Sequence, residues 1–242
     1  MKKIISHSAL FATLALGMVS ASFADDSSDT SLLANTTFKI GALNINPHSE
    51  ATALSGPFTP VDALSLKVES KTTLYLGVAY NFTDNWQADL VLGIPPKHTV
   101  DVVVLNPNVI TPEMAATNGQ AAAHVTQFAP TAFLNYVFGS KTDSFRPYVG
   151  LGINYTKFTK AESTATNDNL NGGPTTLSLT SSKGAAAQIG FSQKISGQWS
   201  AYASYATAKV HTVLTSDTLG IERTSNIKFS PAAITLAIGR SF

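Results

Sequence analysis

The chain has 242 residues, and only 13% of them are charged, which is about half the share usual for a soluble globular domain. The 16 basic residues nearly balance the 15 acidic ones, whereas nucleic-acid binders carry a strongly basic face, so no nucleic-acid partner is expected. The absence of cysteine excludes disulfides and thiolate metal sites.

Residues 1–24 have the features of a secretory signal peptide. Lys2 and Lys3 precede an apolar stretch from Ala9 to Val19, and Ser22-Phe23-Ala24 supplies the small residues that a signal peptidase requires. Cleavage is expected after Ala24. The alternative is an uncleaved anchor, for which the apolar stretch is short.

After the signal peptide, a Ser- and Asp-rich flexible leader is expected at 25–35, followed by one folded domain at 36–242. In this domain apolar and polar residues alternate with a period of two, which is typical of β-strands and not of helices. Eight segments show this alternation: 38–43, 73–82, 86–94, 131–138, 148–156, 177–192, 199–206 and 234–242.

The connections between these segments alternate strictly between short and long. The short ones lie at 83–85, 139–143 and 194–197, and the long ones at 46–72, 96–123, 158–175 and 209–228. An even strand number with this alternation predicts an all-β, eight-stranded antiparallel transmembrane β-barrel with short periplasmic turns and long extracellular loops. A soluble β-sandwich is the alternative, but its loop lengths need not sort by side.

Six aromatic residues lie at the strand ends beside the short turns. In a transmembrane barrel, aromatic residues collect where hydrocarbon meets lipid headgroups, so these six are predicted to form a periplasmic-side girdle. Ordinary core aromatics would not need to gather at one edge. The six are Tyr80, Phe82, Trp86, Tyr136, Phe138 and Trp199.

The inward positions of the predicted barrel carry mostly small, uncharged residues, and eight strands leave room only for side chains or one slender ligand. Asp89 is an exception, because it places a carboxylate at an inward position in mid-strand. It is either a polar group of a pore or, as we favour, the structural partner of an inward cation or hydroxyl. The candidates for lining the lumen are Asp89, Val91, Gly150, Gly152, Asn154, Tyr202 and Ala206.

The sequence offers no catalytic arrangement, so no enzyme activity, cofactor or metal is expected. A hydrolase needs a nucleophile, a base and a group that orients the base. The histidines that follow the signal peptide lie in or beside the long connections, where solvated loop residues are expected, and no two share a metal-ligand spacing. These residues are His48, His98, His124 and His211.

The stretch from Phe128 to Phe158 resembles the central signature of the OmpW family of small outer-membrane β-barrels. The resemblance rests on Phe145-Arg146-Pro147-Tyr148-Val149-Gly150, followed by Gly152-Ile153-Asn154-Tyr155-Thr156. It implies a location in the cell outer membrane, among its lipids, and a narrow, largely apolar channel for small hydrophobic molecules. The alternative that it leaves open is a structural or adhesive barrel whose extracellular loops act as a toxin or phage receptor.

The terminal Phe242 is also shared with the family, and the resemblance implies that the barrel assembly machinery reads it. Arg240 departs from the pattern, since an aromatic or apolar residue is expected there. The family narrows its lumen with apolar side chains from the third and seventh strands, which correspond here to Val91 and Ala206. Ala206 stands where a large aromatic would close the passage, so Tyr202 is predicted to take that role.

Overall fold

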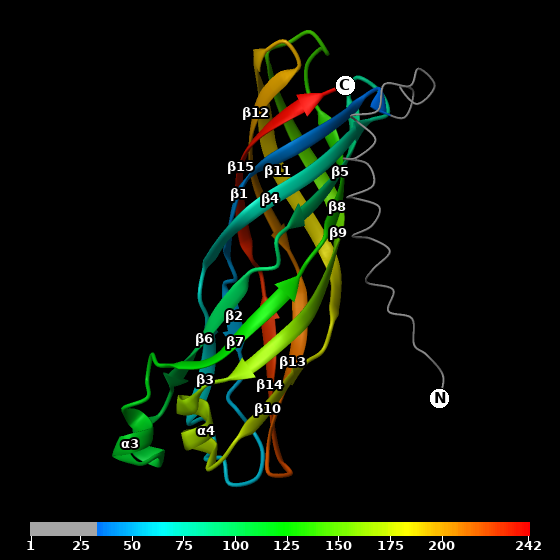
Figure 1. The fold of residues 1–242 in the computed structure, drawn as a ribbon. Helices are drawn as coiled ribbons and strands as arrows, with labels where there is room; N and C mark the ends of the chain where they lie inside the picture. Colours follow the sequence, from blue (N-terminus) through cyan, green and yellow to red (C-terminus); the bar gives the residue numbers. More distant parts are fainter. Residues whose placement is uncertain (1–32) are drawn as a thin grey trace, which may run out of the picture. The chain divides into compact units, whose positions relative to one another are not determined.

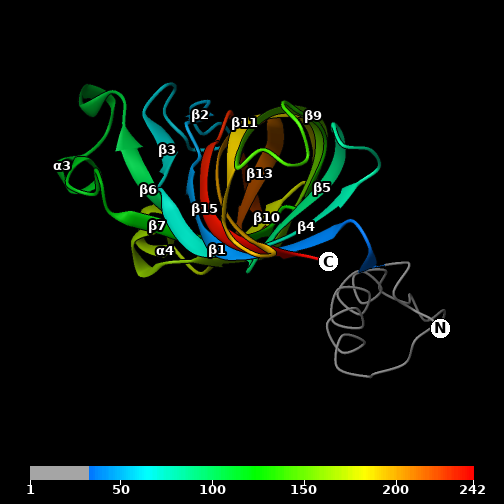
Figure 2. The ribbon, with the colours of Figure 1, turned by 90° about the horizontal axis from the view of Figure 1, so that it is seen from above.

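Eight antiparallel strands close into a barrel in the computed structural model, which describes residues 33–242 (Figure 1). The predicted signal peptide and most of the predicted leader lie outside the described residues. Figure 2 shows the strands arranged around a common interior. In their order around the wall they are β1 (Thr36–Asn46), β4 (Lys71–Asn81), β5 (Trp86–Gly93), β8 (Thr131–Val137), β9 (Phe145–Ser163), β11 (Ser182–Ser196), β12 (Trp199–Ala208) and β15 (Ala232–Ser241).

Pairing of β15 with β1 closes the ring, with Ile40 opposite Ile238. Side chains alternate between the two faces of the wall, as period-two patterning requires. Leu151 and Leu236 are 75% and 62% exposed on the outside, whereas Asn135 is completely buried inside. The outer face is therefore apolar and the inner face largely polar, which is the arrangement that a barrel in lipid needs.

The barrel has two different ends. At the turn end, which also carries the C-terminus, strands are joined by the short connections. There Arg146 donates hydrogen bonds to the backbone carbonyls of Phe138 (3.2 Å), Asp84 (2.5 Å) and Gly139 (3.3 Å). The Arg146 guanidinium thus joins two neighbouring turns.

At the opposite end, which we call the extended end, the predicted long connections are present, but much of their length forms strands that the sequence analysis did not predict (Figure 1). One group adds to the edge of β9, and the other forms a separate four-stranded sheet with β10. Strand pairing satisfies the backbone polar groups of these segments, which long loops would leave to solvent. The added strands are β7 (Ala121–Phe128), β6 (Lys97–Val104) and β3 (Leu64–Val68), and the separate sheet contains β10 (Thr175–Leu179), β13 (Val210–Thr218), β14 (Ile221–Phe229) and β2 (Ser49–Ala51).

The predicted strand at 177–192 is two strands. β10 and β11 are separated at Thr180 and Ser181. Odd-numbered residues of β10 face inward, whereas even-numbered residues of β11 do so. Leu177 and Leu179 consequently pack against the apolar core of the extended end, while Ile189 is 57% exposed outside. One continuous strand, as the alternation at 177–192 predicted, would have put all three residues on the same face, so that prediction is corrected.

Three short helical segments complete the extended end: η2 (Pro107–Val109), α3 (Pro112–Ala115) and α4 (Ala165–Asn171). Polar side chains cap each N-terminus, as when the Thr164 hydroxyl accepts from the Asn167 backbone N–H. Within residues 33–242, no helix is long and apolar enough to cross a membrane.

Candidate functional site

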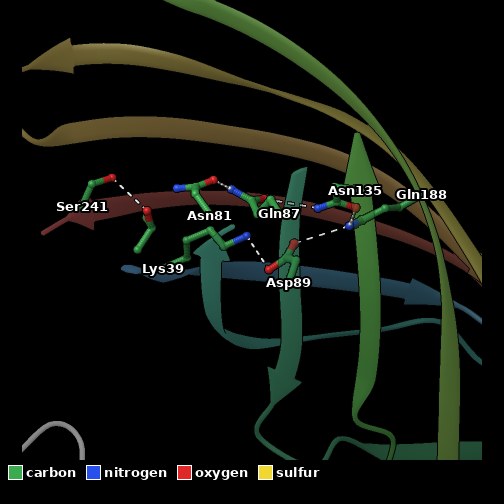
Figure 3. Close-up of polar contacts among 8 residues, drawn as sticks. Lys39, Asn81, Gln87, Asp89, Asn135, Gln188 and Ser241 are labelled. Atoms are coloured by element: carbon green, nitrogen blue, oxygen red, sulfur yellow. Dashed lines mark hydrogen bonds and ion pairs between the residues drawn. The ribbon is translucent and has the colours of Figure 1, made fainter. Parts of the chain in front are cut away.

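A buried polar network fills the barrel interior toward the turn end. Lys39 Nζ lies 2.7 Å from Asp89 Oδ1, and both side chains are only 2% exposed. Gln188 Nε2 donates to Asp89 Oδ2 at 3.4 Å and to Asn135 Oδ1 at 2.7 Å. Asn135 continues the chain of hydrogen bonds to Gln87 (Figure 3). Strands β1, β5, β8 and β11 are thus joined across the lumen.

The ion pair supplies Asp89 with the inward cation that a structural role requires. Its partner Lys39 is on β1, and the sequence analysis did not pair the two residues. Burying either charge alone would be very costly, and each offsets that cost for the other. Gly150 makes room for this arrangement, because a Cβ there would collide with Asn135 Oδ1. A Cβ at Gly152 would collide with the carbonyl of Ala132.

Aromatic rings surround the Lys39 ammonium. Its Nζ lies 5.2 Å from the centre of the Tyr202 ring, and Tyr202 packs with Tyr75, Leu43 and Ala237. Tyr202 is therefore part of the closed, turn-side half of the lumen. Two residues farther along β12, Ser204 lines the cavity described next, whereas Tyr202 lies in the closed half of the lumen. That Tyr202 takes the role of the aromatic missing at Ala206 stays a prediction.

Beyond the network, a cavity of about 150 Å³ extends toward the extended end. Val91 and Ala206 line it from β5 and β12, which are opposite strands of the eight, and Asn154 lines it from β9. Near the network its lining is polar, with Gln188 among the residues there. Farther along it is mostly apolar, formed by residues that include Leu66, Val100, Val125, Leu177, Leu214 and Ile227.

The wall beside this cavity has a stretch without strand pairing. The ladder between β5 and β8 ends at Val91 and Thr131, both of which line the cavity. The chain then passes through Pro95-Pro96 on one side and Pro130 on the other, and proline has no N–H to donate. Backbone contact resumes where Gln127 N donates to Pro96 O at 3.3 Å.

The six aromatic residues predicted as a girdle all lie at the turn end and are 37–59% exposed. Edge-on ring contacts join Tyr80 to Phe82, and Trp86 to Tyr136 and on to Phe138. Phe145 and Phe191, whose rings are 5.2 Å apart, lie at the same end. The sequence analysis missed these two, although both are odd-numbered residues near short turns and odd-numbered residues of their strands point outward. A membrane-interface role for the six predicted residues stays a prediction.

The terminal residue is held in the barrel seam. Asn35 N donates to Phe242 O, and Phe242 N donates to Thr36 O, both at 3.0 Å. Arg240, which departs from the family pattern, places its guanidinium 4.9 Å from the centre of the Phe242 ring. The assembly role of Phe242 remains a prediction.

One histidine expected to be solvated is buried. His98 on β6 is 3% exposed, its Nδ1 lies 2.9 Å from the Glu69 carbonyl oxygen, and its Nε2 lies 3.2 Å from Gln127 Nε2. Burial lowers the pKa of His98 below its ordinary value. The solvated-loop interpretation is wrong here, because Lys97–Val104 forms a strand whose alternate residues point into the core.

Comparison with known proteins places these features in a family. Residues 34–242 match the OmpW family. Outer membrane protein W of Vibrio cholerae is 28% identical over 182 residues, covering 73% of this chain and 76% of the relative. Outer membrane protein W of Salmonella typhimurium is 30% identical over 176 residues, covering 72% of this chain and 75% of the relative.

Among solved structures, the outer membrane protein OprG from Pseudomonas aeruginosa has the same fold. Its TM-score is 0.73 at 22% identity, with 86% of this chain and 96% of that chain covered. The predicted eight-stranded barrel and its location in the outer membrane are thereby confirmed. The sequence match and the barrel geometry agree, and the chain belongs to the OmpW family.

Proposed function

We propose that this barrel is a channel through which small apolar molecules enter from outside the cell. The observation that carries the proposal is the cavity of about 150 Å³, whose walls toward the extended end are mainly Leu, Val, Ile and Ala. Apolar pockets with few polar groups are the usual sites for small apolar ligands. With its short turns toward the periplasm, the barrel presents this cavity to the extracellular side.

The polar network opposes a straight path from the cavity to the periplasm. An apolar solute cannot replace the hydrogen bonds and the ion pair of Lys39, Asp89 and Gln188, so separating them would leave charges unpaired. The gap between β5 and β8 beyond Val91 and Thr131 adjoins the cavity, and no ladder hydrogen bonds between these two strands would have to break there. We therefore place the exit of the solute through this wall, into the membrane.

The experiment compares two tryptophan substitutions on the same strand. Ala206→Trp fills the cavity, whereas the control Ala203→Trp places the same side chain on the outer face of β12. Uptake of toluene by whole cells should fall several-fold in the first variant and stay at the parental rate in the second. If both variants take up toluene like the parent, the cavity is not on the path of the solute and the proposal fails.

A role in surface contacts is the second candidate function, and exposed apolar side chains at the extended end favour it. Phe58 and Val61 are 88% and 83% exposed in the segment between β2 and β3, and Leu219 is 79% exposed in the turn between β13 and β14. Apolar side chains grouped on a water-exposed surface are typical of interaction sites. Replacing all three with Ser should abolish attachment of cells to octyl-coated beads and leave toluene uptake unchanged. Unchanged attachment would contradict a contact role for these residues.

A further inference from the structure

At the extended end of the cavity, two polar side chains each have a buried atom without a hydrogen-bond partner among residues 33–242. Ser216 on β13 is 4% exposed, and its Oγ is buried without a hydrogen bond to any described residue. Arg223 on β14 likewise has a buried Nη1 without a partner within residues 33–242. These two residues are directly opposite each other in the β13–β14 ladder, and both line the apolar cavity.

No ion pair within the described residues compensates the charge of Arg223. Ion pairs in the described part of the chain join Lys39 to Asp89, and Lys97 and Lys160 to Glu162, and none includes Arg223. A buried, unpaired donor on a charged group is unfavourable, so such a group is expected to meet an anionic acceptor. Arg223 also borders a second, smaller space beneath the segment that contains Phe58 and Pro60, so its guanidinium lies where the two spaces meet.

We infer that Arg223 and Ser216 bind the carboxylate head of a small amphipathic anion whose apolar chain lies in the cavity. The guanidinium offers paired N–H donors that match a carboxylate, and the Ser216 hydroxyl adds another donor beside them. The apolar chain then lies among side chains such as Leu214 and Ile227, which belong to the same two strands and face the same cavity. This inference rests on the proposed channel function and specifies a class of solute for it.

The test compares octanoate with octan-1-ol, which has the same chain length but no charge. Binding to the protein in lipid nanodiscs is measured by calorimetry, with empty nanodiscs subtracted. Arg223→Gln should weaken octanoate binding about tenfold to a hundredfold, as loss of a hydrogen bond to a charged group predicts, and leave octanol binding unchanged. Ser216→Ala should weaken octanoate binding by a smaller factor.

Lys228→Gln is the matched control, because it removes the same charge from the exposed outer side of β14. It should leave both affinities unchanged. A second readout is the carboxyl pKa of bound ¹³C-labelled octanoate, which a neighbouring guanidinium should hold below its value in free solution. Arg223→Lys retains a cation but not the paired donors, so it should weaken octanoate binding less than Arg223→Gln does. This variant and the parental pKa still decide the question if Arg223→Gln fails to fold.

The outcomes separate this inference from the channel proposal. If Arg223→Gln binds octanoate as the parent does, or if octanoate and octanol lose affinity equally, Arg223 does not bind the carboxylate and the inference is overturned. Octanol binding to the parent would in either case continue to support an apolar channel. If the parent binds neither molecule, the channel proposal itself fails.

Discussion

Replacing Asp89 with Asn while Lys39 remains should destabilise the barrel strongly. The two charges are 2.7 Å apart and 2% exposed, so at an effective dielectric constant of about 20 their attraction is about 6 kcal/mol. Desolvation of the two ions costs several kcal/mol each and offsets most of that attraction. Removing one charge abolishes the attraction but leaves the other ion desolvated. Each single variant, Asp89→Asn or Lys39→Met, should therefore lose about 3–5 kcal/mol of unfolding free energy.

The double variant with Lys39→Met and Asp89→Leu should be much closer to the parent, because no buried charge is left unpaired. The measurement is urea titration of the barrel in lipid vesicles, followed by the fluorescence of Trp86 and Trp199. Asp84→Asn, in an exposed turn, is the matched control and should change stability by less than about 0.5 kcal/mol. Single variants that cost under about 1 kcal/mol, or a double variant that costs the sum of both, would refute the reasoning.

Three further predictions concern the outer face of the barrel, the added strands β6 and β7 of the extended end, and the signal peptide. Leu236→Arg, at a lipid-facing position, should lower the unfolding free energy by about 2–4 kcal/mol in the same titration. The control His211→Arg, on the exposed side of β13, should lower it by less than about 0.5 kcal/mol. Equal losses would contradict the assignment of faces. Because burial lowers the pKa of His98, the unfolded chain binds a proton before the folded one does, so stability is full above about pH 6.5 and declines below it. The protection of β6 and β7 amides against hydrogen exchange should fall in the same way between about pH 7.5 and about pH 5.5. If the same fall occurs in His98→Gln, His98 is not its cause. N-terminal sequencing of outer-membrane fractions should begin at Asp25; recovery of chains that retain the signal peptide would contradict cleavage after Ala24.

The barrel itself was predictable because each strand carries its own signal. Period-two alternation assigns every residue of a strand to one face, and the short turns fix which strands are neighbours. The outward placement of Leu151 and Leu236 and the inward placement of Asp89 and Val91 follow from this parity alone.

The site was less predictable because it depends on the relative heights of strands that are distant in sequence. Lys39 and Asp89 both have inward parity, but only the register of β1 with β4, and of β4 with β5, shows that Asp89 lies two residues from Val91, the β5 residue in line with Lys39. The same stagger places Tyr202 beside Lys39 and leaves Ala206 at the cavity. Parity gives the face of a residue and says nothing about its depth in the lumen.

The strands of the extended end were not predicted, for a different reason. Lys97–Val104 alternates as clearly as the barrel strands do, with His98, Val100 and Val102 on one face. It was assigned to a loop because the pattern of short and long connections was taken as complete. Opposed residues such as Ser216 and Arg223 could not be found from the sequence, because their pairing requires the β13–β14 hairpin.

The seam between β1 and β15 has a consequence for how this barrel forms. The ladder joins the first wall strand to the last, so one edge of β1 has no permanent neighbour until nearly the whole barrel segment is in place. Contacts between such distant parts of a chain form slowly, and an unpaired strand edge recruits other chains. The edge of β1 must therefore be shielded by another partner for most of the assembly process, and a chain that lost β15 would keep two edges open for aggregation.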